Sequence, residues 1–272
     1  MISATLQLRR NWPAAVLFAY TILFFAFILA PIVIVVVVSF ASEAYVAFPI
    51  SGWSLRWYHR IVEYQPFVDS FVLAIQIAVL SSALGALLGV PAALLLARSR
   101  SRAAYLTMTF LLSPLSMPGI VLGFALLFYL SKLGLGVSFL SLLIGHTVVS
   151  LPYIVRTVAG VYRNTPPSLE ETAMVLGANK WNVFWHVTLP MIRPGIFAGC
   201  LFAMLLSFDN LPISLFFASP STSTLPVVVL SYLEYNFDPA VASISAVQLA
   251  FAIVVLVVIE RFYGLRSFSP TT

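Results

Sequence analysis

Few side chains in this sequence are of types that perform chemistry. The three histidines, His59, His146 and His186, stand apart from one another and suggest no metal site. The two lysines, Lys132 and Lys180, do not follow the glycine that precedes the lysine of a phosphate-binding loop. The nucleophile and zinc motifs Gly-x-Ser-x-Gly and His-Glu-x-x-His are also missing. We therefore expect a chain that is not an enzyme and that binds no ATP, metal or other cofactor itself.

The composition explains why polar groups are so scarce. Of the 272 residues, 61% are hydrophobic and 8% are charged, whereas roughly 25% of a soluble domain is charged. A water-soluble enzyme is nearly excluded on this ground. Residues 1–272 are expected to form a single membrane domain.

Charge-free stretches indicate where the chain crosses the membrane. About 20 apolar residues span the hydrocarbon core as a helix, and the alternation of polarity that a β-barrel needs is missing. We predict an all-α membrane protein with six transmembrane helices, with the fifth interrupted by Asp209. The predicted spans cover about 14–40, 68–97, 104–130, 138–161, 195–217 and 239–262.

The basic residues predict the orientation. With a cytoplasmic N-terminus, eleven of the fourteen lie inside, and only Arg56, Arg60 and Lys132 lie outside. Both termini are then cytoplasmic in a bacterial-type inner membrane, and the net charge of +5 gives no reason to expect nucleic acid. The inside set is Arg9, Arg10, Arg98, Arg100, Arg102, Arg156, Arg163, Lys180, Arg193, Arg261 and Arg266.

Two outer segments are longer than turns. Residues 41–67 mix Trp53 and Trp57 with arginines, which is typical of a helix at the headgroup level; a docking surface for an extracellular partner is the alternative. Residues 218–238 contain no lysine or arginine but carry Glu234 and Asp238. This acidic segment favours a cationic or neutral solute.

The inner segment 163–194 predicts two short helices joined at a glycine. Ser168 and Glu171 have the spacing of a capping box, and Gly177 stands where a left-handed residue would end the first helix. A second amphipathic stretch covers 180–188. Such helices either lie on the membrane or their own bundle, or present an apolar surface to a separate soluble subunit.

The same segment resembles a known family. Glu171-Thr172-Ala173, then Gly177, then Val187-Thr188-Leu189-Pro190 is similar to the EAA loop of permease subunits of binding-protein-dependent ABC importers, departing only at Thr172 and Val187. Flanking runs at 118–123, 152–157 and 194–196 extend the resemblance over about 65–262. Within the family, 207–210, 219–220 and 224–226 resemble the second permeases of spermidine/putrescine importers.

The resemblance implies a type I importer fold and several partners. A soluble ATPase dimer would bind ATP and Mg and receive the first helix in a groove, and a second permease, in a heterodimer or a homodimer, would complete the path. An extracytoplasmic solute-binding protein would deliver the solute, and lipid would surround the bundle. Glu171 is then a partner contact, a local cap, or both. The implied coupling residues are Leu169, Glu170, Glu171, Ala173, Leu176, Gly177 and Ala178.

Asp209 is the one carboxylate placed deep in a predicted span. It lies roughly 21 Å beyond Gly195 at 1.5 Å per residue, and its charge should face protein or water. Ser207, Asn210 and Ser214 lie on nearly the same helical face and are, with Asp209, the candidate residues of the substrate path. We predict that Asp209 and Asn210 border the path and favour a cation, with helix packing as the alternative.

The solute is the least determined property. A polyamine or similar cation is favoured, while ferric ion, opines and phosphonates stay open. An ion-coupled secondary transporter is a rival reading, but no convincing internal repeat supports it. An integral-membrane enzyme lacks clustered catalytic groups. His146, in the fourth span, is expected to be a hydrogen-bonded residue between helices.

Overall fold

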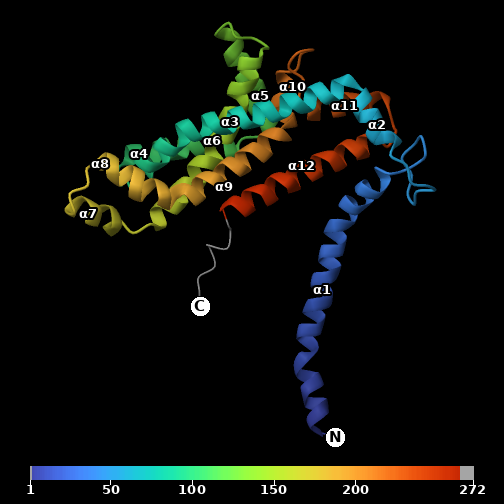
Figure 1. The fold of residues 1–272 in the computed structure, drawn as a ribbon, viewed down its shortest axis with the longest axis horizontal. Helices are drawn as coiled ribbons and strands as arrows, with labels where there is room; N and C mark the ends of the chain where they lie inside the picture. The colour runs from blue at the N-terminus through green and yellow to red at the C-terminus, as the bar shows by residue number, and fades with distance from the viewer. Residues whose placement is uncertain (1, 264–272) are drawn as a thin grey trace. The chain divides into compact units, whose positions relative to one another are not determined.

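The computed structural model describes residues 2–263, which are mostly helical (Figure 1). Within that range there is no strand, only an isolated antiparallel bridge between Ala41 and Trp53. The described residues fall into two compact units. One contains the chain up to Tyr64 together with Tyr235–Phe251, and the other contains Gln65–Glu234 and the chain from Ala252 onward. The all-α prediction is confirmed; Arg266, which entered the orientation argument, lies outside the described residues.

Five helices in residues 2–263 are long and apolar enough to cross a membrane. Four of them, α1, α3, α6 and α12, agree with predicted spans. The fifth runs without interruption from Lys180 to Phe208, through α8, η2 and α9, so it begins well before the predicted residue 195. The bounds are α1 (Ile2–Val38), α3 (Gln65–Ala97), α6 (Phe139–Asn164), α8 (Lys180–Val183), η2 (Phe184–Thr188), α9 (Leu189–Phe208) and α12 (Ala240–Tyr263).

The predicted third span is not one helix. α4 (Arg102–Leu112) and the 3-10 turn η1 (Ser113–Ser116) are followed by α5 (Gly119–Lys132), and the direction changes by 112° at the break. Met117 is extended, with φ −92° and ψ 138°, because the ring of Pro118 disfavours a helical conformation in the preceding residue. The single helix over 104–130 is therefore wrong, and the pair forms a sixth, broken span or a re-entrant loop.

Helices α3, α6 and α9 lie side by side and form the centre of the larger unit (Figure 1). Small residues allow this close approach. A Cβ atom on Gly85 of α3 would lie 2.9 Å from Cδ1 of Ile154 on α6, and one on Gly199 of α9 would lie 2.9 Å from the Ile154 Cα. A Cβ atom on Gly195 would lie 3.2 Å from the carbonyl oxygen of Thr157. Any larger side chain at these glycines would push the helices apart.

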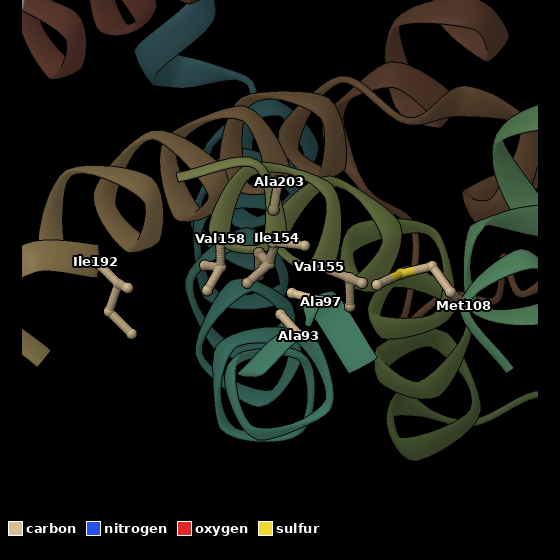
Figure 2. Close-up of a cluster of buried hydrophobic side chains, with 9 residues drawn as sticks. Ala93, Ala97, Met108, Ile154, Val155, Val158, Ile192 and Ala203 are labelled. Atoms are coloured by element: carbon tan, nitrogen blue, oxygen red, sulfur yellow. The ribbon is translucent and has the colours of Figure 1, made fainter. Parts of the chain in front are cut away.

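Apolar side chains fill the space between these three helices. Figure 2 shows Ile154, Val155 and Val158 of α6 between the alanines of α3 and Ala203 of α9. This cluster joins the C-terminal halves of α3 and α6 to α9, near the inner segment that connects α6 to α9. Its buried members are Ala93, Ala97, Met108, Ile154, Val155, Val158, Ala159, Ile192 and Ala203.

The smaller unit is organised around the end of α1. The hydroxyl groups of Ser39 and Tyr58 lie 2.7 Å apart, and Ser243, in the first turn of α12, donates to the Ser39 carbonyl at 2.9 Å. Tyr58 belongs to α2 (Arg56–Glu63), so the predicted short helix in 41–67 is present. The other outer segment is not a plain loop, because α11 (Leu225–Tyr235) occupies half of it.

Candidate coupling loop and translocation path

The first inner helix is α7 (Ser168–Val175), and it begins differently from the prediction. Pro167 precedes it with φ −60° and ψ −28°, and the Pro167 carbonyl accepts hydrogen bonds from the N–H groups of Glu170 and Glu171, each at 3.1 Å. No side chain caps this end. The capping box between Ser168 and Glu171 is therefore wrong, because the ring of Pro167 already fixes φ for the first turn and Ser168 is helical.

The other end of α7 is as predicted. Gly177 has φ +90°, a left-handed conformation that glycine adopts without strain. Its N–H donates to the Met174 carbonyl, and the N–H of Ala178 donates to the Ala173 carbonyl, both at 3.0 Å. This pair of bonds is the Schellman arrangement. It turns the chain sharply between α7 and α8.

The side of α7 that faces away from the helix bundle carries exposed apolar side chains. Leu176 is 82% exposed, Val175 is 86% exposed and Leu169 is 48% exposed, whereas Ala173 is partly buried. Leu169 and Leu176 thus project as the coupling prediction requires, but Ala173 faces inward. Val175 was missed, although it directly precedes Leu176 and is similarly exposed. We call Val175 and Leu176 the α7 knob.

Glu170 points the opposite way and is held by three separate elements. Arg98, the residue after α3, donates from Nη1 to Oε2 of Glu170 at 2.7 Å. The hydroxyl of Tyr162 on α6 donates to the same oxygen at 3.2 Å, and the hydroxyl of Thr188 in η2 donates to Oε1 at 2.6 Å. The carboxylate therefore connects α7 to the ends of α3 and α6 and to the start of α9.

Arg98 also joins α3 to α6. Its Nη2 donates to the carbonyl oxygens of Tyr162 at 3.1 Å and Thr165 at 2.8 Å, and its guanidinium stacks 3.7 Å from the Tyr162 ring centre. In return, Nε of Arg163 donates to the Ala97 carbonyl at 2.9 Å. Sequence reasoning missed these partners. The one available signal was that Arg98 is the first charged residue after the long apolar stretch of 70–97.

The second inner helix continues directly into the fifth span. Asn179 accepts a hydrogen bond from the Asn182 N–H at 2.8 Å and caps α8. One π-helical turn, η2, then leads into α9. Trp181, Phe184 and Trp185 contact one another, with ring centres 5.3 to 6.2 Å apart. The predicted order of helix, glycine bend and helix is confirmed.

The fifth span is interrupted where Asp209 stands. α9 ends at Phe208, and the exposed Asp209 follows in a non-helical conformation. Asn210 then accepts a hydrogen bond from the Ile213 N–H at 3.0 Å and caps α10 (Leu211–Phe216). Pro212, in the first turn of α10, suits a helix start because it has no N–H to leave unpaired. The interruption is as predicted, but 195–217 is two helices and not one.

His146 bonds to both sides of this break. Its Nδ1 lies 2.8 Å from the hydroxyl of Ser207 on α9, and its Nε2 lies 3.1 Å from the hydroxyl of Ser214 on α10. Ser81 of α3 also donates to Ser207 at 3.0 Å. The expectation of a hydrogen-bonded histidine between helices is confirmed. Ser207 and Ser214 are buried, so their hydroxyl groups face His146 and not an open channel.

A cavity of about 170 Å³ lies beside the break. Its wall includes Asn210, Tyr153 of α6, and Met117 and Gly119 at the bend between α4 and α5. Asp209 does not line it. Of the four predicted path residues, Asn210 thus lines this half-open pocket, Asp209 is exposed, and the two serines are buried and bond to His146.

The amino-acid sequence is similar to those of known transport proteins. The model of a family described as "Binding-protein-dependent transport system inner membrane component" matches residues 85–265. The putrescine transport system permease protein PotI of Escherichia coli (strain K12) is 31% identical over 248 residues, covering 89% of this chain and 86% of the relative. The molybdenum transport system permease protein ModB of Mycobacterium tuberculosis (strain ATCC 25618 / H37Rv) is 34% identical over 221 residues, covering 74% and 83%.

Solved structures share the fold at low sequence identity. A chain of a bacterial ABC transporter involved in the import of the acidic polysaccharide alginate has a TM-score of 0.70 and 17% identity, covering 94% of this chain and 98% of that one. A chain of an amino acid ABC transporter has a TM-score of 0.60 and 16% identity, covering 75% and 96%. These similarities support the type I importer fold.

Proposed function

The chain belongs to the family of binding-protein-dependent transport system inner membrane components, and from this premise we propose that it forms part of the path for a polyamine. It is a multi-pass inner-membrane permease subunit of an ABC importer, a transport subunit and not an enzyme. A solute-binding protein is its partner, as in the related alginate importer, whose structure includes a periplasmic protein.

The observation that carries the polyamine proposal is the extended similarity to a putrescine permease, 31% identity over 89% of this chain. Charge supports the same solute. Asp209 lies at the interruption of the fifth span, between α9 and α10. Glu234 and Asp238 lie in an outer segment, 218–238, that contains no lysine or arginine. A field of negative charge raises the local concentration of a cation. Asp209 and Asn210 are the side chains that we assign to the path.

A second candidate solute is an oxyanion such as molybdate, because a molybdenum permease is 34% identical over 74% of the chain. An oxyanion would require positive side chains or converging N–H groups along its route. The outer segment 218–238 has no basic side chain, and Asp209 would repel the anion. We therefore place the polyamine ahead of anions such as molybdate and phosphonates, and the similarity to the putrescine permease places it ahead of ferric ion and opines.

An ATPase dimer and a second permease complete the proposed importer. An ATPase dimer binds ATP and Mg, and the uncovered knob of Val175 and Leu176 inserts into a groove on one of its subunits. Because this chain has one α7, a second permease must present another helix to the second ATPase subunit, and we favour a heterodimer. The excess of basic residues in 98–102 and 156–193 supports the proposal that this side, and both termini, lie in the cytoplasm.

The direct test is uptake by the reconstituted importer. The chain is expressed with its neighbouring-gene subunits, purified and placed in proteoliposomes with the cognate binding protein outside and ATP inside. We expect labelled putrescine to accumulate and unlabelled spermidine, but not molybdate, to compete. Accumulation of labelled molybdate without accumulation of either polyamine would reverse the order of the two candidates.

A further inference from the structure

We propose that Glu170 and Arg98 form a positioning clamp that fixes α7 against the ends of the core helices, so that a displacement of α7 moves α3, α6 and α9 together. The proposal rests on the function proposed above in one respect, because the displacement would come from the bound ATPase. The clamp itself is a property of this chain alone.

α7 has little else to hold it in place. It is eight residues long, none of its residues is buried, and it leaves the bundle through the prolines at 166–167 and returns through Gly177. A helix that fully buries no apolar side chain gains little hydrophobic contact to fix its direction, here chiefly that of the partly buried Ala173. Its inward-facing carboxylate, Glu170, is therefore the main fixed point on the side of the bundle.

The contacts of Glu170 are distributed as a clamp requires. Oε2 accepts from Arg98 and Tyr162, at the ends of α3 and α6, while Oε1 accepts from Thr188, at the start of α9. The side chains of Arg98 and Glu170 are only 24% and 15% exposed. Shielding from water strengthens such a pair relative to a fully solvated one.

Arg98 supplies the second half of the clamp. One arm of its guanidinium binds Glu170, and the other binds the carbonyl oxygens of Tyr162 and Thr165. A planar fork can hold both sets at once, whereas the single ammonium group of a lysine cannot reproduce the geometry. A change from arginine to lysine therefore keeps the charge but should release one set.

The neighbouring glutamate has no part in the clamp. Glu171 is exposed, and in the described part of the chain its carboxylate makes no ion pair. Two adjacent carboxylates thus have different tasks: Glu171 faces the solvent side where the ATPase would bind, and Glu170 faces the bundle.

The clamp is tested first without any partner. In the full chain with Cys200→Ala, a nitroxide label at Leu176→Cys reports the mobility of α7 in lipid nanodiscs by electron paramagnetic resonance. We expect Glu170→Gln and Arg98→Lys to narrow the spectral lines, because α7 moves more freely. The exposed neighbour Arg100→Gln is the matched control and should leave the spectrum unchanged. Unchanged spectra in both clamp variants would overturn the proposal.

The second test measures coupling in the assembled importer. The ratio of solute transported to ATP hydrolysed should fall by about tenfold in Glu170→Gln and Arg98→Lys, equivalent to about 1.4 kcal/mol, while the ATPase is recovered in normal amount. A normal ratio in both variants would overturn the clamp as a coupling element. If the unmodified chain recovers no ATPase, the proposed function fails instead, and the spectra still decide whether the clamp exists.

Discussion

The Nδ1 atom of His146 lies 2.8 Å from the hydroxyl oxygen of Ser207, in the last turn of α9. The Nε2 atom of the same ring lies 3.1 Å from the hydroxyl of Ser214, on α10. One buried imidazole thus connects the helix before the break at Asp209 to the helix after it. Because Asn210 caps α10 and lines the pocket beside the break, the position of Asn210 depends on His146.

Replacing His146 tests that dependence. His146→Phe keeps a ring of similar size but removes the hydrogen bonds that the imidazole makes with Ser207 and Ser214; Ser207 keeps only its bond from Ser81. We expect the free energy of unfolding in detergent to fall by about 1–2 kcal/mol. Thermal unfolding followed by circular dichroism provides the measurement, with the exposed His186→Phe as control. Equal stability of the two variants would mean that the ring does not support the break.

The close approach of α6 and α9 predicts that alanine has different effects at two glycines. A Cβ atom on Gly199 would overlap the Thr157 hydroxyl and approach the Ile154 Cα to 2.9 Å, whereas one on Gly160 meets nothing within 4 Å. Gly199→Ala should therefore destabilise the protein by about 1–3 kcal/mol, and Gly160→Ala should not. Size-exclusion profiles after graded heating would measure both, and matching losses would contradict the packing described here.

If the α7 knob contacts the ATPase, a charge placed in the knob should weaken ATPase binding. Leu176→Glu places a charge in the apolar contact, so the amount of ATPase that co-purifies should fall by about tenfold or more, as expected for a hot-spot residue that contributes about 2 kcal/mol. Phe237→Glu alters a similarly exposed apolar side chain in the outer segment and serves as control. Normal ATPase recovery with Leu176→Glu would remove the knob from the interface.

Asp209 predicts a charge effect on transport. Asp209→Asn keeps the size of the side chain but removes its negative charge, so the KM for putrescine uptake should rise by about threefold to tenfold, the effect of about 1 kcal/mol. Glu63→Gln removes another exposed outer carboxylate and should leave the KM unchanged. Unaltered uptake by a normally expressed Asp209→Asn variant would leave helix packing as the role of Asp209.

Much of the fold could be predicted because lipid imposes a simple rule: a spanning helix excludes charge. That rule located α1, α3, α6 and α12 closely. It failed at Pro118, because a charge-free stretch contains no information about direction and the 112° bend arises from the local geometry of Met117 and Pro118. The start of the fifth span at Lys180 was missed for another reason: Lys180 and Arg193 place charges before residue 195, so the charge rule began the span too late.

Features of the candidate site could be predicted only where they depend on residues close together in the sequence. Gly177 was placed correctly because a left-handed helix end depends on neighbouring residues. The sequence patterns assigned a cap and a motif position to Glu171 and no partner to Glu170, and only the fold shows that Glu170 meets Arg98, 72 residues away. The capping box failed because Pro167 already satisfied the N–H group that Ser168 was expected to bind.

ATP-dependent uptake in proteoliposomes tests the central claim most directly. Putrescine uptake should require the binding protein outside and hydrolysable ATP inside, and it should persist when ionophores abolish all ion gradients. Uptake that continues without ATP and stops when the gradients are removed would contradict the account and identify an ion-coupled transporter.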